Sequence, residues 1–453
     1  MQAARFFKVS AIIALLLALA TASASAAVLS YKERPVRVNQ KPVKLVLWHY
    51  WGAQRQDMVQ EMIDRFQKAY PWITVQAVPK STSGMRDEII TSIVSGTPPD
   101  VIMLRRYEVP SFAYEGLLLP IDSFLAERKL NPAEHFYPQE MNGFVVDGKT
   151  YSMPGPTGGA TVYLIAYNRD MFEQVGLVDR APQTWDEFET FAAKLNKWDP
   201  NRGFVQIGIT SNVQAYLPLL YSNNGRYISD DGRKVYLTSV ESIEVLNWMA
   251  NFTQKINRGL SAENQFLKNI GNPTIGAFWA GYQGMFWANV SIFWNRDEFA
   301  PKMRMGVGLF PRNGRRPGAG NHGVVTEGWG YVIPVNIARD KQYAAYLLLE
   351  WLTAEPEGAG VFMLKQKRPS PIRGFNTLPV YYQINEHWDI VLKALESDVA
   401  IPIPPVYSDM LRNVLIPMAT DVISGTSNAQ SAAERAQQLA QQMLDSYWAN
   451  KKK

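Results

Sequence analysis

The sequence predicts an α/β protein of two domains, and three observations lead to this prediction. Strand and helix patterns alternate between residues 44 and 120. A segment rich in Gly and Pro, 151–159, separates this region from a new strand pattern at 162–167. The chain has 453 residues, which is long enough for more than one hydrophobic core.

The first region has the pattern of a βαβαβ unit. Apolar and β-branched runs predict strands, and apolar residues at helical spacing predict the helices between them. Pro71 and the breaker Gly96-Thr-Pro-Pro99 end these helices. Such alternation favours a parallel sheet. The predicted strands are 44–51, 73–78 and 100–104, and the predicted helices are 56–70 and 85–95.

The carboxyl ends of these strands carry aromatic residues. Ligands bind parallel sheets in the crevice beyond those ends. Here they are Trp48–Trp51, Lys80–Ser83 and Arg105–Tyr107. The first and third ends indicate a binding cleft.

The N-terminus has the parts of a secretory signal peptide. Arg5 and Lys8 precede the apolar run 11–20, and small residues follow it. The run is short for a membrane span. We expect a signal peptide at 1–26, cleaved after Ala24 or Ala26, and a polar leader at 27–42. The product would be soluble and not lipidated, exported to a bacterial periplasm.

Composition excludes some chemistry. The chain has no Cys, so it has no disulfide, no thiolate metal site and no Cys nucleophile. Its formal charge of +5 is too mild to indicate nucleic-acid binding.

Two capping boxes mark helix starts in the rest of the chain. Thr184-Trp-Asp-Glu187 predicts one helix, and Ser431-Ala-Ala-Glu434 predicts another that runs to Trp448. Further predicted strands are 205–209, 306–310 and 331–334, and further predicted helices are 121–127, 212–224, 241–255 and 342–353.

No pattern of a catalytic or cofactor site is present. The four His are scattered, without zinc spacing, and there is no Walker A or Gly-x-Ser-x-Gly sequence. Gly318–Gly323 fits a dinucleotide pattern but not a strand-to-helix turn, which favours a surface loop. We expect no enzyme, metal or cofactor, although a carboxylate pair for glycoside cleavage depends on spatial and not sequence spacing.

Eight motifs occur in one order along the chain. They are Trp48; Gly96-Thr-Pro-Pro-Asp-Val-Ile102; Glu115-Gly-Leu-Leu118; Tyr167-Asn-Arg-Asp-Met-Phe-Glu-Gln-Val-Gly-Leu177; Pro182-Gln-Thr-Trp-Asp-Glu-Phe188; Phe278-Trp-Ala-Gly281 with Gly284-Met285; Gly308-Leu-Phe-Pro311; and Gly328-Trp-Gly-Tyr-Val-Ile-Pro334. In this order they resemble the family 1 extracellular solute-binding proteins, the maltose-binding type that delivers sugars to ABC importers. The sequence departs from that family at Glu327 and at Asn224-Gly225, where the family often has Gly-Gly.

The resemblance implies the two-lobed periplasmic-binding-protein fold, an α/β architecture. Each lobe would have a central, mostly parallel sheet flanked by helices, and the ligand cleft would lie between the lobes. It implies an N-terminal lobe of 43–155 plus about 309–365, and a C-terminal lobe of 156–308 plus about 366–450. The breaker-rich segment 154–159 would lie at the hinge.

A sugar site needs flat aromatic rings for the apolar faces of the sugar, and carboxylate, amide or Arg groups for its hydroxyls. Strand alternation favours Trp51 for the cleft and Trp48 for the core. Of Arg105 and Arg106, we expect one to face the cleft and the other to face solvent. From these considerations and the resemblance, the candidate ligand-binding residues are Trp51, Arg105, Tyr107, Asn212, Gln214, Tyr216, Trp279, Trp287, Asn289, Glu327, Trp329 and Arg373.

The resemblance therefore implies a monomeric carbohydrate-binding protein, most simply for an oligosaccharide, that delivers its ligand to ABC importer permease subunits. Nucleic acid is not an expected partner. One alternative is an anionic or non-sugar solute, such as a uronate oligosaccharide, a polyamine or glycerol phosphate. Another is a secreted glycoside-active enzyme.

Overall fold

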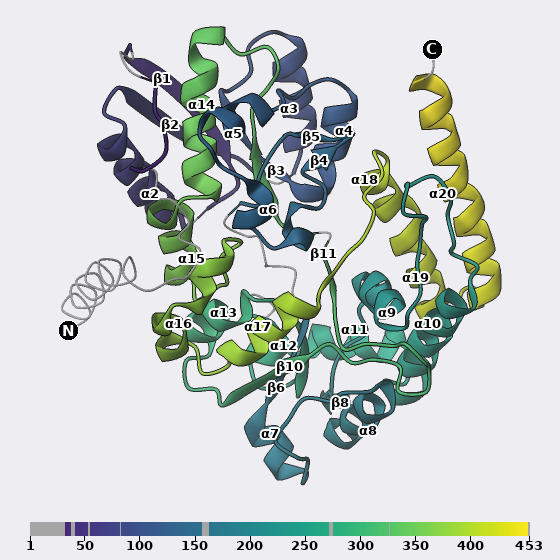
Figure 1. Ribbon diagram of the computed structural model, residues 1–453. Coiled ribbons are helices and arrows are strands. Elements are labelled where there is room, and N and C mark those ends of the chain that lie inside the picture. The colour runs from purple at the N-terminus through teal and green to yellow at the C-terminus, as the bar shows by residue number, and fades with distance from the viewer. Residues whose placement is uncertain are drawn as a thin grey trace.

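The computed structural model describes residues 32–37, 41–52, 55–81, 83–155, 163–270, 275–325 and 327–451. Two lobes lie one above the other in Figure 1, each built on its own sheet. The predicted signal peptide lies outside the described residues, as does the part of the hinge segment beyond Gly155. Among the helices that are described, none has both the length and the apolar character needed to cross a membrane.

The first lobe contains the predicted βαβαβ unit, which is confirmed. Its sheet has the order β12-β3-β1-β2, with β1 parallel to both β2 and β3. β12 joins β3 antiparallel. The early elements are β1 (Val43–His49), α2 (Arg55–Ala69), β2 (Ile73–Pro79), α3 (Met85–Val94), β3 (Val101–Arg105), η1 (Arg106–Glu108), α4 (Val109–Tyr114), α5 (Asp122–Glu127), α6 (Pro132–His135), η2 (Pro138–Met141), β4 (Val145–Val146) and β5 (Lys149–Thr150). Later segments complete this lobe with β12 (Trp329–Val332), α14 (Arg339–Thr353), η5 (Pro356–Gly360) and α15 (Val361–Lys365).

The second lobe differs from the expectation of a parallel sheet. Its three strands have the order β10-β6-β9, and β6 pairs antiparallel with both neighbours. The apolar pattern of a strand does not encode its direction, so the sequence could not show this. Gly306 of β10 lies opposite Tyr167, and a Cβ there would lie only 2.1 Å from that ring. The first elements are β6 (Leu164–Asn168), α7 (Arg169–Gln174), α8 (Trp185–Leu195), β7 (Lys197–Asp199), β8 (Gly203–Gln206), η3 (Val213–Ala215), α9 (Tyr216–Ser222), α10 (Val240–Asn251), η4 (Phe252–Ile256), α11 (Leu260–Asn269), α12 (Gly276–Trp279), β9 (Met285–Ala288), α13 (Ile292–Phe299) and β10 (Met305–Leu309).

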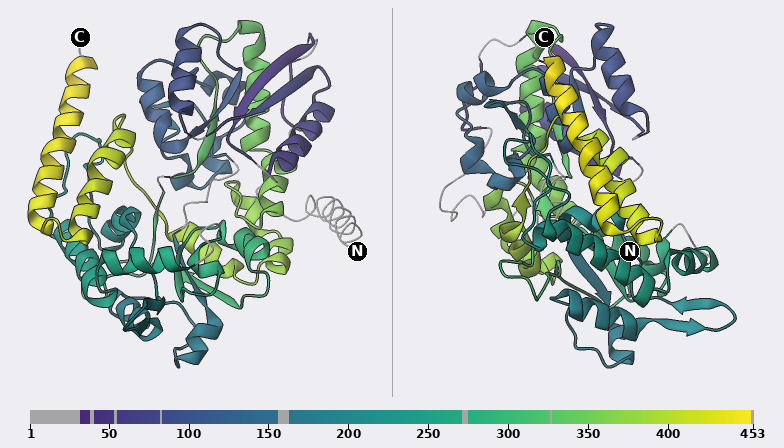
Figure 2. Two further views of the ribbon diagram at one scale, coloured as in Figure 1. Left: turned by 180° about the vertical axis from the view of Figure 1, so that it is seen from behind. Right: turned by 90° about the vertical axis from the view of Figure 1, so that its right-hand side faces the viewer.

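The remaining C-terminal elements extend along the second lobe, and the last of them runs towards the level of the first lobe. They are η6 (Arg373–Thr377), α16 (Pro379–Ile384), α17 (Trp388–Ser397), β13 (Val399–Ala400), α18 (Tyr407–Met410), η7 (Leu411–Leu415), α19 (Ile416–Ser424) and α20 (Ala429–Lys451). α20 runs along one edge of the molecule, and its end lies level with the first lobe (Figures 1 and 2). Between the lobes, β11 (Val324–Val325) pairs in parallel with β13.

The two predicted capping boxes have different outcomes. Thr184 caps α8 by accepting a hydrogen bond from the amide of Glu187, as predicted. The prediction at Ser431 is wrong, because α20 already begins at Ala429 and the side chain of Asn428 accepts from the Ser431 amide at 2.8 Å. Asn is at least as good an N-cap as Ser, so the earlier residue starts the helix.

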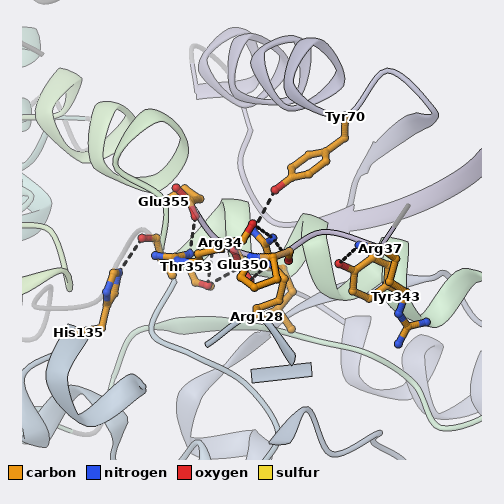
Figure 3. Close-up of polar contacts among 12 residues, drawn as sticks. Arg34, Arg37, Tyr70, Arg128, His135, Tyr343, Glu350, Thr353 and Glu355 are labelled. Carbon is orange, nitrogen blue, oxygen red and sulfur yellow. Dashed lines mark hydrogen bonds and ion pairs between the residues drawn. The ribbon is translucent and has the colours of Figure 1, made fainter. Parts of the chain in front are cut away.

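The segment predicted as a polar leader is in part anchored in the first lobe. Arg34 is 3% exposed and pairs with Glu350 at 2.8 Å and with Glu355 at 2.5 Å. Arg128 donates to Glu350 at 2.7 Å and to the backbone carbonyl of Arg34 at 3.1 Å. Figure 3 shows these side chains converging from segments far apart in the sequence. Buried charges require partners, and this network supplies them.

Candidate functional site

The carboxyl edge of the first sheet holds a continuous group of rings and one guanidinium. Trp329, the first residue of β12, pairs directly with Arg105, the last residue of β3. The Arg105 guanidinium carbon lies 5.0 Å from the centre of the Trp329 ring and 5.7 Å from that of Tyr107. The rings of Trp329 and Tyr50 are 4.5 Å apart. These contacts hold the Arg105 guanidinium over aromatic faces, which attract its positive charge.

Gly328 allows this arrangement. Its φ of 104° is one that residues with a Cβ rarely adopt, and its carbonyl accepts from the Arg106 amide at 3.0 Å. The chain therefore turns into β12 directly beside η1. That turn places Glu327 next to Arg105 and Tyr107.

A cavity of about 280 Å³ lies between this edge and the second lobe. The first lobe contributes Arg105 and Tyr107, and the connecting segments contribute Tyr163 and Glu327. The wall from the second lobe comes from η3 with α9 and from α18, η7 and α19. It consists of Val213, Gln214, Tyr216, Leu217, Pro218, Tyr407, Leu411, Arg412, Leu415 and Ile416.

The ionisable groups of the cavity influence each other. Burial raises the pKa of Glu327, and Arg105 and Arg106 oppose that change. Burial lowers the pKa of Arg105, but Tyr107 and Glu327 outweigh it, so the net shift is upward. Burial and Glu327 raise the pKa of Tyr107 to about 12. Tyr107 thus keeps its hydroxyl proton at neutral pH and can donate a hydrogen bond.

Arg106 does not face solvent, contrary to prediction. It is 0% exposed and pairs with Glu140 at 2.6 Å. Its Nε donates to the carbonyl of Glu327 at 2.7 Å. Arg106 therefore supports the segment that carries Glu327, while the neighbouring Arg105 lines the cavity.

Five of the twelve candidate residues line the cavity together. Tyr216 does so although its side chain is almost fully buried, and its hydroxyl lies 2.7 Å from that of Ser242. Trp329 does not line the cavity itself, but its ring contacts Arg105, which does. The five are Arg105, Tyr107, Gln214, Tyr216 and Glu327.

Two candidate tryptophans lie in the core. Trp51 is 5% exposed, donates from its indole to Tyr331 at 3.3 Å and packs on Phe362. Trp279 is 9% exposed and packs on Phe278 and Phe286. Their rings are used in packing, and neither lines the cavity.

The other four candidates also lie outside the cavity lining. The indole of Trp287 donates to the carbonyl of Thr210 at 2.9 Å. Asn212 caps η3 and Asn289 accepts from the Ser291 amide, which are both local turn roles. Arg373 lies over the ring of Tyr137 at 5.5 Å.

Sequence reasoning missed Tyr163, Tyr407 and Arg412. Tyr407 contacts Tyr107 across the lobes, with ring centres 5.9 Å apart. Arg412 lies in η7, a π-helical turn, and such turns often occur at functional sites. No local pattern in the sequence marks that turn. In the described part of the chain, no group of three or more His, Asp or Glu side chains could hold a metal ion.

The family model for bacterial extracellular solute-binding proteins matches residues 61–378, more than half of the chain. The chain belongs to this family. Among solved structures, this solute-binding protein is similar to the ABC substrate-binding protein Lmo0181 from Listeria monocytogenes in complex with cycloalternan, with a TM-score of 0.74. That match has 18% identity and covers 90% of this chain and 100% of the other. It confirms the two-lobed fold.

Two curated relatives are similar in sequence over shorter stretches. The mannitol-binding protein of Pseudomonas aeruginosa is 28% identical over 156 residues, which is 34% of this chain and 34% of the relative. The maltotriose-binding protein of Pyrococcus abyssi is 25% identical over 203 residues, which is 44% of this chain and 41% of the relative. This solute-binding protein thus spans less than half the length of either relative.

Proposed function

We propose that this protein binds a carbohydrate, most simply an oligosaccharide, between its lobes and delivers it to the membrane permease of an ABC importer. The cavity carries this proposal, because residues of both lobes line it and combine rings with hydrogen-bonding groups. Tyr107 and Tyr163 offer ring faces, while Arg105, Gln214 and Glu327 offer polar groups. The maltotriose-binding relative supports a saccharide ligand.

The cavity also suits a binding role in size. Its volume of about 280 Å³ is close to the lower end of the range for ligand sites, roughly 300–1,000 Å³. A ligand that contacts both lobes would stabilise the closed arrangement relative to an open one. We propose a rotation of the lobes about the segments that join the two sheets, with lobe boundaries as the sequence predicts. Export to the periplasm and a monomeric state belong to the same proposal.

A thermal-shift screen tests the ligand class. Mature protein is heated with neutral oligosaccharides, uronate oligosaccharides, polyols, polyamines and glycerol phosphate. A ligand that binds only the native state raises the melting temperature, because binding adds to the free energy of unfolding. We expect neutral oligosaccharides to give the largest shifts. If no saccharide raises the melting temperature, the carbohydrate proposal fails.

One observation favours a second ligand class. Arg105 and Arg412 line the cavity, and Glu327 is the single carboxylate among the described residues that line it. Arg recognises carboxylate and phosphate groups well. An anionic saccharide is therefore the second candidate, and a shift with uronates alone would favour it. Incubation with labelled oligosaccharides tests for an enzyme, since cleavage would contradict a binding role.

A further inference from the structure

The C-terminal helix α20 is anchored in the second lobe over most of its length. Its buried face packs into the core cluster that also contains α10 and α19. Gln437 and Gln441 accept hydrogen bonds from the amides of Thr238 and Val235, at 3.0 and 2.9 Å. The residues of the buried face are Ala429, Ala432, Ala433, Ala436, Ala440 and Leu444.

The last turn of α20 instead contacts the first lobe. The ring of Trp448 lies edge-on to that of Tyr114, at the end of α4, with centres 5.2 Å apart. The Tyr447 hydroxyl lies 3.2 Å from the Glu115 carboxylate, and the Lys451 ammonium donates to the Tyr114 carbonyl at 2.5 Å. We name these three residues of α20, Tyr447, Trp448 and Lys451, the C-terminal strap.

Each side of this contact is tied to a different core. Tyr114 packs against the core of the first lobe that includes Phe112 and Phe144. Trp448 packs against the core of the second lobe, and the Arg233 guanidinium lies 3.7 Å from its ring centre. A rotation of one lobe relative to the other must therefore move Tyr114 relative to Trp448.

The strap lies outside the candidate ligand cavity. None of its residues lines that cavity, and Trp448 and Tyr114 instead border a separate space of about 220 Å³. Residues of both lobes line this second space, among them Asp147 and Asp231. The strap can thus affect binding only through the arrangement of the lobes.

We propose that the C-terminal strap stabilises the lobe arrangement seen here, in which both lobes line the cavity, and so sets the affinity for ligand from a distance. This rests on the proposed function, in which ligand binds that arrangement. Its contacts are two ring pairs, in which Tyr114 meets both Trp448 and Tyr447, two hydrogen bonds, and one partly exposed ion pair between Lys451 and Glu115. Such contacts are weak enough to break during each cycle of opening. Because apparent affinity scales with the population of the competent arrangement, loss of the strap weakens binding without altering a cavity residue.

Interlobe distance measured without ligand tests the strap directly. The chain has no Cys, so Thr91→Cys on α3 and Lys194→Cys on α8 give one exposed spin-label site in each lobe. We expect Trp448→Ala to shift the distance distribution towards longer distances in ligand-free protein. The matched control is Trp198→Ala, since Trp198 is also partly exposed and its ring contacts Phe204 and Arg258, which both belong to the second lobe. An unchanged distribution in Trp448→Ala, with melting as in the control, would overturn the proposal.

A second variant separates lost contact from damaged folding. Tyr114→Ala removes the first-lobe ring that packs on both Trp448 and Tyr447, so it should shift the distances at least as far as Trp448→Ala. The double variant should add little to Tyr114→Ala alone, because that change already removes the ring contact of Trp448 with the first lobe. With a ligand found by screening, each variant should bind on the order of five-fold more weakly. Additive shifts, or tighter binding, would contradict the strap. A protein that binds no sugar but shows the distance shift would refute the proposed ligand and leave the strap intact.

Discussion

Arg105 and Trp329 are directly paired neighbours on β3 and β12, and the Arg105 guanidinium lies over the Trp329 indole. The two residues are far apart in the sequence, and they lie where β3 ends and β12 begins, beside the candidate cavity. Trp329 therefore fixes the position of a charged cavity residue and keeps part of its own ring exposed.

Substitution of Trp329 by Ala tests this relationship. It removes the ring under Arg105 and a partly exposed face beside the cavity, so we expect weaker binding by about 2 kcal/mol, as for an aromatic anchor. Little stability should be lost. Calorimetric titration with a saccharide found by screening, beside a thermal melt, measures both effects.

Trp51→Ala is the matched control for a buried ring. Trp51 is 5% exposed and packed between Phe362 and Tyr331, so its loss leaves a core cavity. We expect a cost of about 3–5 kcal/mol in the free energy of unfolding. Unchanged affinity in a well-folded Trp329→Ala protein would remove Trp329 from the site.

The buried ionic network around Arg34 predicts a large effect of Glu350→Gln. Glu350 pairs with both Arg34 and Arg128, and all three side chains are almost fully buried. Removal of its charge leaves two buried guanidinium groups without that partner, at a cost of about 3–5 kcal/mol. Glu127→Gln breaks the partly exposed pair with Arg37 and should cost roughly 0–1 kcal/mol. Urea unfolding of both variants checks the contrast, and equal effects would contradict it.

Buried His135 predicts a loss of stability in mild acid. Burial lowers its pKa from 6.5 to about 4, and its Nε2 lies 2.7 Å from the Ala354 carbonyl. Between pH 6.5 and about 4, His135 binds a proton in the unfolded chain but not in the folded one. The contribution of neutral His135 to the free energy of unfolding is therefore complete above pH 6.5 and falls as the pH decreases towards 4. The loss is on the order of 3 kcal/mol. Unfolding measured from pH 7 to pH 4 should show a shallower decline in His135→Gln, and parallel curves would refute this role.

The start of α20 predicts opposite results for two neighbouring polar residues. Asn428→Ala removes the side chain that accepts from the Ser431 amide, so it should cost about 1 kcal/mol. Ser431→Ala lies inside the helix, where Ala is the better helix former, so it should be neutral or slightly stabilising. Thermal melts compare the two. A larger loss at Ser431 would show that the sequence-based assignment was right.

Local sequence patterns were sufficient to predict those helices and strands whose own residues carry a clear periodicity. The apolar runs around Leu47 and Val101 predicted β1 and β3, and the helical spacing of apolar residues around Ile63 predicted α2, because periodicity and breakers specify such elements. Strand direction in the second lobe depends on pairing, so the sequence could not show that β6 is antiparallel to its neighbours. The partners of Arg34 lie far along the chain, Glu350 in α14 and Glu355 just after it, so from sequence alone that segment had the pattern of a polar leader.

The same limit applies to the candidate site. Arg105 and Tyr107 were predictable because they lie at the end of a recognisable strand and just after it. Tyr407 and Arg412 reach the cavity only through the tertiary arrangement of α18 and η7. Trp51 and Trp279 were chosen for ring chemistry, but rings serve the core equally well, and sequence alone does not separate these uses.

Small-angle scattering during a titration with the saccharide that gives the largest thermal shift measures closure of the lobes in solution. We propose that ligand binding brings the two lobes together around the cavity between Arg105 and Gln214. We predict a radius of gyration that falls as ligand is added and becomes constant at one ligand per protein. A radius of gyration that does not change at saturating ligand would contradict closure of the lobes around the ligand.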